Sequence, residues 1–142
     1  MQNHSAHHRF LELAFDFHLA GASLLNTQRK SVLPPLFLFA RSIELSLKYL
    51  LSGKGLSEEI LSKHPYRHSL TNLFNQALRL NSIEINFLSD LEVSALELLS
   101  KEYSATHLAY SSADQRLLIP TLSLAEDIST KFVELNNPHE VN

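Results

Sequence analysis

Cysteine and tryptophan are absent from the 142-residue chain, and glycine occurs only three times. Without cysteine the chain has no disulfide framework, thiolate nucleophile or CxxC redox pair, and no zinc finger or ribbon. Few glycines leave few tight turns, and no segment alternates polar and β-branched apolar residues over the length of a strand. These absences argue against small disulfide-rich folds and against a β-sheet protein.

The sequence also lacks a long apolar run and an apolar leader. The longest run, residues 32–40, is interrupted by two prolines and stops at Arg41, so it cannot cross the ~30 Å of a bilayer interior. The first ten residues, MQNHSAHHRF, are polar where a signal peptide would begin its apolar segment. We therefore expect a soluble, cytoplasmic protein with no membrane partner.

A basic excess is missing too. Lysine and arginine number 12 against 15 aspartate and glutamate, which gives a formal charge of −3. Such a balance disfavours long duplex DNA as a partner, although it permits a local basic pocket for a nucleotide or RNA. With 44% hydrophobic and 19% charged residues, the chain is expected to fold as one domain over residues 1–137, followed by a loose tail at 138–142.

Apolar residues recur at spacings of three and four along most of the chain, which is the pattern of amphipathic helices. Ser57 and Ser69 are expected to cap helices, and Pro120 to lie in the first turn of the last one. The predicted helices cover about residues 5–26, 34–53, 69–80, 87–103 and 120–135, with a short turn after Ser57. The second of them is expected to end at Gly53 or Gly55. The fold class is all-α, as an up-and-down bundle of four long helices plus an extra one.

The helix at 34–53 is apolar around most of its circumference and is expected to be the central element. The apolar stripe of the first helix is predicted as Phe10, Leu13, Ala14, Phe17, Ala20 and Leu24, and that of the fourth as Phe87 or Leu88, Leu91, Ala95, Leu98 and Leu99. The central helix and its neighbours carry more apolar surface than one small bundle hides. We therefore expect a two-fold homodimer that buries at least ~1,000 Å².

Three charged residues lie in the central helix. Arg41, Glu44 and Lys48 stand at i, i+3 and i+7, so they share one face and can form ion pairs along it. One interpretation is a solvated strip on the bundle surface. The other is a semi-buried network at the rim of a pocket, which fits the central position of this helix.

Eight histidines invite a metal hypothesis, but their spacing does not support one. The terminal group of His4, His7 and His8 lies where a helix frays, and no helix carries the ExxH pair of carboxylate-bridged metal sites. His18 has apolar neighbours and is expected to be a hydrogen-bonded packing residue. We predict neither a metal nor another cofactor.

Two further clusters could contact an anion. Arg67 and His68 precede the expected cap at Ser69, and a helix N-terminus attracts phosphate groups, although such a loop can also be simply solvated. A ligand there could also reach Lys48 or Lys101.

Near the end of the fourth helix, a cation, a histidine and two phenols fall within ten residues. These groups are ones that RNA cleavage uses, although tyrosines at such a position also pack at the edge of a core. The residues are Lys101, Tyr103, His107 and Tyr110.

The segments FARSIELSLKYLL at 39–51 and RHSLTNLFNQA at 67–77 resemble the HEPN (higher eukaryotes and prokaryotes nucleotide-binding) superfamily, over about residues 5–136. The resemblance implies an α-helical up-and-down bundle, often homodimeric. Catalytic members are metal-independent ribonucleases, frequently toxins with a nucleotidyltransferase-like partner protein, and many relatives are inactive binding or assembly modules. The residues that match the family pattern are Arg41, Glu44, Lys48 and His68.

The ribonuclease members carry an arginine followed, after four to six residues, by a histidine, and this chain has no such pair. Lys101 and His107, with five residues between them, stand in that place, but lysine lacks the donor fork of arginine. The leading hypothesis is therefore a non-catalytic, dimeric module that binds a nucleotide, RNA or a partner protein, with Arg41, Glu44, Lys48, Arg67, His68 and Tyr103 as ligand-binding residues. The alternatives are a metal-independent endoribonuclease that uses Lys101, His107 and Tyr110, and an adaptor bundle.

Overall fold

The computed structural model describes residues 2–106, 108 and 118–137, and every regular element among them is an α-helix. The helices are α1 (Gln2–Leu24), α2 (Leu33–Gly53), α3 (Glu58–Leu61), α4 (Leu70–Arg79), α5 (Asp90–Ser104) and α7 (Leu122–Asn136). The all-α prediction is confirmed, whereas the predicted tail at 138–142 lies outside the described residues. None of the described helices is long and apolar enough to cross a bilayer.

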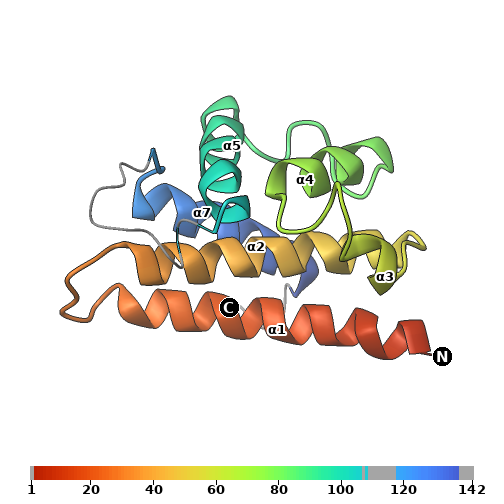
Figure 1. Ribbon diagram of the computed structural model, residues 1–142, viewed down its shortest axis with the longest axis horizontal. Coiled ribbons are helices and arrows are strands. Elements are labelled where there is room, and N and C mark those ends of the chain that lie inside the picture. The colour runs from red at the N-terminus through yellow and green to blue at the C-terminus, as the bar shows by residue number, and fades with distance from the viewer. Residues whose placement is uncertain (1, 107, 109–117, 138–142) are drawn as a thin grey trace.

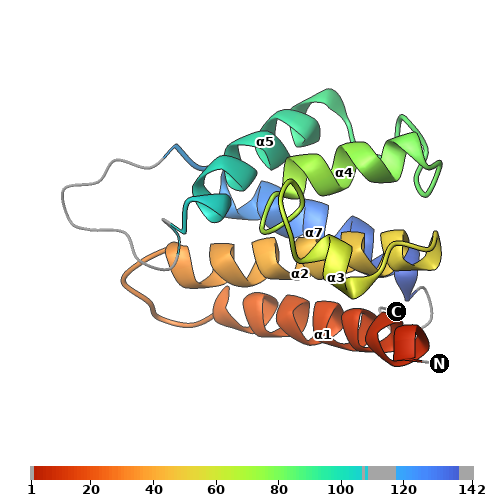
Figure 2. The same ribbon diagram turned by 45° about the vertical axis from the view of Figure 1, so that its right-hand side comes forward.

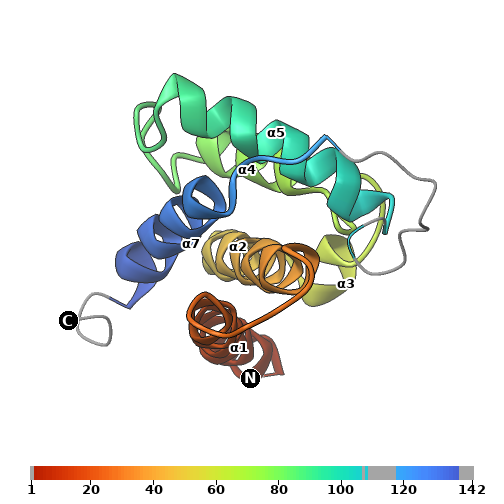
Figure 3. The ribbon, with the colours of Figure 1, turned by 90° about the vertical axis from the view of Figure 1, so that its left-hand side faces the viewer.

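Helix α2 runs through the middle of the bundle. It lies antiparallel to α1 on one side, and α4 and α5 lie on the other side (Figures 1 and 2). Helix α7 packs against α2 and also contacts α1 and α5, so it closes the remaining side, as the end-on view in Figure 3 shows. Helix α5 crosses α2 obliquely, which brings the C-terminal end of α5 close to α2 (Figure 1).

The sequence of α2 explains its central place. Two prolines occupy its first turn, where their missing N–H groups cost nothing, and it ends at Gly53 as predicted. Most of its apolar side chains are buried within one chain, and Phe39, Ile43 and Leu47 have no exposed surface, whereas Phe37, Tyr49 and Leu50 are partly buried. Helix α2 therefore leaves less apolar surface uncovered than the homodimer prediction assumed.

Small and polar residues let α1 approach its neighbours closely. His18 on α1 is buried, and its Nδ1 lies 2.8 Å from Ser129 Oγ on α7. Burial lowers the pKa of His18, so the neutral ring is favoured. His18 is thus the hydrogen-bonded packing residue that was predicted. Beside it, Gly21 faces the ring of Phe39 on α2.

Replacing Gly21 by alanine is expected to lower the free energy of unfolding by about 1–2 kcal/mol. A Cβ atom at this position would come within 2.9 Å of the fully buried Phe39 ring, and that clash outweighs the better helix propensity of alanine. Urea unfolding measures the change. The control is Gly53→Ala, because a Cβ there meets only His7 Cε1 at 3.5 Å, and equal stability of the two variants would contradict the prediction.

Serine or threonine side chains cap the N-termini of α3, α4, α5 and α7. The predicted caps at Ser57 and Ser69 are confirmed, because each hydroxyl accepts a backbone N–H from the first turn of its helix. Helix α5 begins at Asp90 and not at residue 87 or 88, since Ser89 and Glu92 form a capping box. Pro120 was expected inside α7 but precedes it, because Thr121 is the cap.

Parts of two predicted apolar stripes are wrong. Leu13 and Ala20 on α1 are exposed, because α1 packs against the bundle through the row that contains Phe10, Ala14 and His18. Leu91 and Leu98 on α5 are exposed as well. The buried face of α5 combines apolar and polar residues, namely Glu92, Ala95, Leu96, Leu99, Ser100, Glu102 and Tyr103.

Candidate functional site

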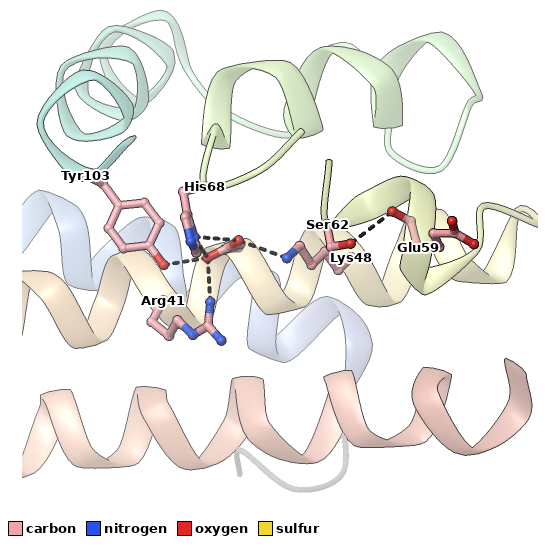
Figure 4. Close-up of polar contacts among 7 residues, drawn as sticks. Arg41, Lys48, Glu59, Ser62, His68 and Tyr103 are labelled. Carbon is pink, nitrogen blue, oxygen red and sulfur yellow. Dashed lines mark hydrogen bonds and ion pairs between the residues drawn. The ribbon is translucent and has the colours of Figure 1, made fainter. Parts of the chain in front are cut away.

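The carboxylate of Glu44 is the centre of the most concentrated group of polar contacts in the described structure (Figure 4). Glu44 lies on the face of α2 that meets α4 and α5, and its side chain has no exposed surface. An isolated buried carboxylate is costly, so it requires cations and donors around it. Four side chains supply them: Arg41, Lys48, His68 and Tyr103. We call these five residues the Glu44 cluster.

The two cations come from α2 itself. Arg41 donates from Nη1 to Glu44 Oε1 at 2.9 Å, one turn before it, and Lys48 Nζ lies 2.9 Å from Oε2, one turn after it. The side chain of Arg41 is 30% exposed and that of Lys48 is 11% exposed. The structure therefore supports a semi-buried network at these positions and not the solvated strip.

His68 reaches the carboxylate from the loop between α3 and α4. Its Nδ1 lies 3.2 Å from Glu44 Oε2, and the side chain is 39% exposed. The backbone of His68 is left-handed, with φ of 53°, directly before the cap residue of α4. In Figure 4 the imidazole points down from this loop toward the carboxylate. His68 is thus both a partner of Glu44 and accessible to solvent.

Tyr103 approaches from the C-terminal end of α5 and donates its hydroxyl to Glu44 Oε1. The ring is buried and meets the His68 ring edge-on, with centroids 5.8 Å apart. Burial, together with the adjacent Glu44 carboxylate, raises the pKa of Tyr103 well above its ordinary value. The phenol therefore acts as a hydrogen-bond donor and not as a general base.

The electrostatics of the Glu44 cluster favour the ionised carboxylate. Burial alone would raise the pKa of Glu44, but the charge of Lys48, the Tyr103 hydrogen bond and the charge of Arg41 outweigh burial and lower the pKa to about 2. Two cations then share one carboxylate, which leaves one excess positive charge, or two when His68 is protonated. The cluster is suited to an anion that approaches from the exposed side of Arg41 and His68.

Other predicted site residues do not join this cluster. Lys101 is exposed on α5, and because it lies two residues before Tyr103, roughly 200° around the helix, it faces away from Glu44. Arg67 is exposed and lies outside the set of cations that contact Glu44. His107 and Tyr110 lie outside the described residues. Of the two cations that the sequence offered beside His68, Lys48 contacts the Glu44 carboxylate, whereas a ligand held jointly by His68 and Lys101 does not fit this arrangement.

The N-terminus of α4 offers less to an anion than the sequence suggested. The backbone N–H of Asn72 donates to Ser69 Oγ, and that of Thr71 donates to Ser100 Oγ on α5 at 3.1 Å. Two first-turn donors are therefore already used by the protein. Sequence reasoning missed Ser100, although its position three residues before Tyr103 places it on the same face of a helix.

A separate cleft of about 990 Å³ lies at the loop between α4 and α5, where Leu78, Ile83, Phe87 and Leu135 are among the lining residues. No residue of the Glu44 cluster lines it, and Glu84 is its one ionisable lining residue. Among the described residues, no group of three or more histidine, aspartate or glutamate side chains is arranged to hold a metal ion. The Glu44 cluster is therefore the stronger candidate for chemistry with a charged ligand.

Comparisons of the chain with protein-family models, with curated proteins and with solved structures gave no match. The function proposed below therefore depends on the geometry of the Glu44 cluster and on the residues that resemble the HEPN pattern.

Proposed function

We propose that the chain is a non-catalytic, HEPN-like domain that acts as a dimeric module and binds a phosphate group of a nucleotide or of RNA at the Glu44 cluster. The observation that carries this proposal is the excess of positive charge around a fully buried carboxylate. Glu44 cannot itself contact a ligand, so we assign it the role of positioning the donors that do.

Arg41 and His68 are the direct contacts in this proposal. Arg41 donates one N–H group, at Nη1, to Glu44, and a guanidinium carries five such groups, so donors remain for a phosphate oxygen. His68 contacts the same carboxylate through Nδ1, which brings the Arg41 and His68 side chains to one place. Lys48 is the least exposed of the cations in the Glu44 cluster, and it adds positive charge without reaching the surface as far as Arg41 and His68 do.

The resemblance to HEPN domains supports the proposal at particular positions. Arg41, Glu44, Lys48 and His68 are the residues that match the family pattern, and all four meet at one carboxylate. The antiparallel pair of α1 and α2 is compatible with an up-and-down HEPN bundle (Figure 1). The endoribonuclease alternative uses Lys101, His107 and Tyr110; of these only Lys101 lies among the described residues, and it faces away from the Glu44 cluster.

Binding of AMP and of a short single-stranded RNA is expected to weaken by about tenfold or more in Arg41→Gln, because a charge-assisted hydrogen bond to phosphate is lost. Isothermal titration gives the affinities. Arg79→Gln is the matched control, because Arg79 is exposed at the far end of α4 from His68 and should not change binding. Affinity should fall only shallowly with salt, as expected when one or two phosphates are neutralised.

Four results would contradict the proposal, and each favours another function. No binding by the unaltered protein, or equal binding by Arg41→Gln, would favour the adaptor bundle. Cleavage of the RNA in the presence of a metal chelator, lost in His107→Ala, would favour the endoribonuclease. A protein partner of the nucleotidyltransferase type would be detected by co-purification, and its binding without any nucleotide affinity would also count against a phosphate site.

A further inference from the structure

Helix α5 presents an apolar strip to solvent. Leu91 is 68% exposed and Leu98 is 38% exposed, and they lie seven residues apart, so they share one face of the helix two turns apart. Exposed Ser94 lies between them on that face. Large side chains that flank a small one at this spacing form a surface into which a second helix can pack.

This strip borders the buried face of α5. Leu99 and Tyr103, which pack toward the core, lie about 80° and 120° around the helix from Leu91. Helix α5 itself lies on the side of α2 opposite to α1, at the periphery of the bundle (Figure 3). No helix of the described chain covers Leu91, so a molecule that binds the strip can reach it from solvent.

Opposite charges lie at the two ends of the strip. Asp90 is the first residue of α5 and Lys101 lies in its last turn, and both are exposed. They are eleven residues apart, which is close to three full turns, so they lie on the same flank of the strip. When two copies of such a helix pack antiparallel, equivalent flanks meet, and the start of one helix lies beside the end of the other.

We propose that a second copy of this chain covers the strip, with α5 packed antiparallel to α5 of the partner about a two-fold axis at the level of residue 95. Asp90 of each chain then faces Lys101 of the other, so one helix face provides two apolar contacts and two ion pairs. This inference rests on the dimeric part of the proposed function and identifies its interface. It also gives Lys101 a role in assembly in place of the predicted role in RNA cleavage.

Charge reversal tests the pairing directly. In the full chain, Asp90→Lys places lysine beside lysine across the axis, and Lys101→Asp places aspartate beside aspartate, so each single variant should raise the dimer dissociation constant about tenfold or more. The double variant, D90K with K101D, restores opposite charges and should return the constant to within about threefold of the original. Sedimentation equilibrium measures the constants against the 16.1 kDa mass of one chain.

The apolar contacts need their own control. Leu91→Ser with Leu98→Ser should also weaken the dimer by about tenfold or more. The control pair is Leu13→Ser with Leu19→Ser, since these α1 leucines are exposed to a similar degree, 37% and 49%, but lie on the other side of α2. Circular dichroism shows for each variant that the helices are retained.

The outcomes separate the two proposals. A dimer that survives both the charge reversals and the α5 leucine changes would overturn this interface while leaving a dimer in place. A chain that remains monomeric at high micromolar concentration would overturn this interface and the dimeric part of the proposed function together. Phosphate binding is measured independently by the Arg41→Gln titration, so its failure is distinguishable from either result.

Discussion

Replacing Glu44 by glutamine is expected to lower the free energy of unfolding by about 3 kcal/mol at pH 7. Glutamine keeps the size of the side chain but removes the negative charge, so Arg41 and Lys48 remain close together without a counter-charge in a semi-buried place. The amide oxygen of glutamine is also a weaker acceptor than a carboxylate oxygen for the hydroxyl of the buried Tyr103. Glu44→Ala should cost at least as much, because it adds a cavity to the lost charge.

Urea unfolding at constant pH provides the measurement, and an exposed ion pair on α1 and α3 provides the control. Arg9 Nη2 lies 3.0 Å from Glu58 Oε1, and about half of each side chain is exposed. Glu58→Gln should therefore change the free energy of unfolding by less than about 0.5 kcal/mol. If Glu44→Gln gave a change as small as this control, the cluster would contribute no more than a surface pair.

Acid is expected to remove the contribution of Glu44 between pH 4.5 and pH 2. The pKa of Glu44 is lowered from 4.5 to about 2 in the folded protein, so the unfolded chain takes up the proton first as the pH falls. The stabilisation is fully present above pH 4.5 and is lost as the pH approaches the folded pKa. A lowering of the Glu44 pKa from 4.5 to about 2 corresponds to about 3 kcal/mol of stabilisation.

This second prediction is tested by a pH series on the original protein and on Glu44→Gln. Other carboxylates contribute to acid unfolding as well. Glu92, for example, has a pKa lowered by Lys131 and Ser89 in spite of burial. Because Glu92 is present in both proteins, its contribution cancels in their difference. That difference should shrink toward zero between pH 4.5 and pH 2, and a difference that stays constant over this range would contradict the assigned role of Glu44.

The helices themselves could be predicted because their signals are local. Two prolines and a terminal glycine delimit α2, and the hydroxyls of Ser57 and Ser69 begin α3 and α4. The start of α5 was also available from the sequence, since serine followed by glutamate three residues later is a capping signal, at Ser89 and Glu92. The apolar stripe alone predicts an earlier start for α5, because Phe87 and Leu88 extend the apolar pattern before the cap.

The buried faces were harder to predict, because periodicity identifies residues that share a face without telling which face is covered. On α5 the apolar count favoured Leu91 and Leu98, yet the structure buries Glu92, with Lys131 as its ion-pair partner, and Tyr103 with Glu44. The partners that make these polar residues tolerable lie on other helices. Their positions depend on packing that a single segment does not encode.

The same distinction applies to the Glu44 cluster. The approach of Arg41 and Lys48 to Glu44 follows from spacing within one helix, so the sequence alone was sufficient. The contacts of Glu44 with His68 and Tyr103 span 24 and 59 residues. They depend on the path of the loop before α4 and on the angle at which α5 crosses α2. Sequence reasoning named both residues but could not place them on this carboxylate.

The position of α7 has a consequence for how the protein is made. This helix packs against α2, α1 and α5, so the apolar surface of α2 is fully covered only after residues 122–136 have been synthesised. While a ribosome is still adding these residues, the side of α2 that α7 will cover is open to water and to other nascent chains. A chain interrupted before Thr121 would leave that surface of α2 exposed and would be a substrate for chaperones and proteases.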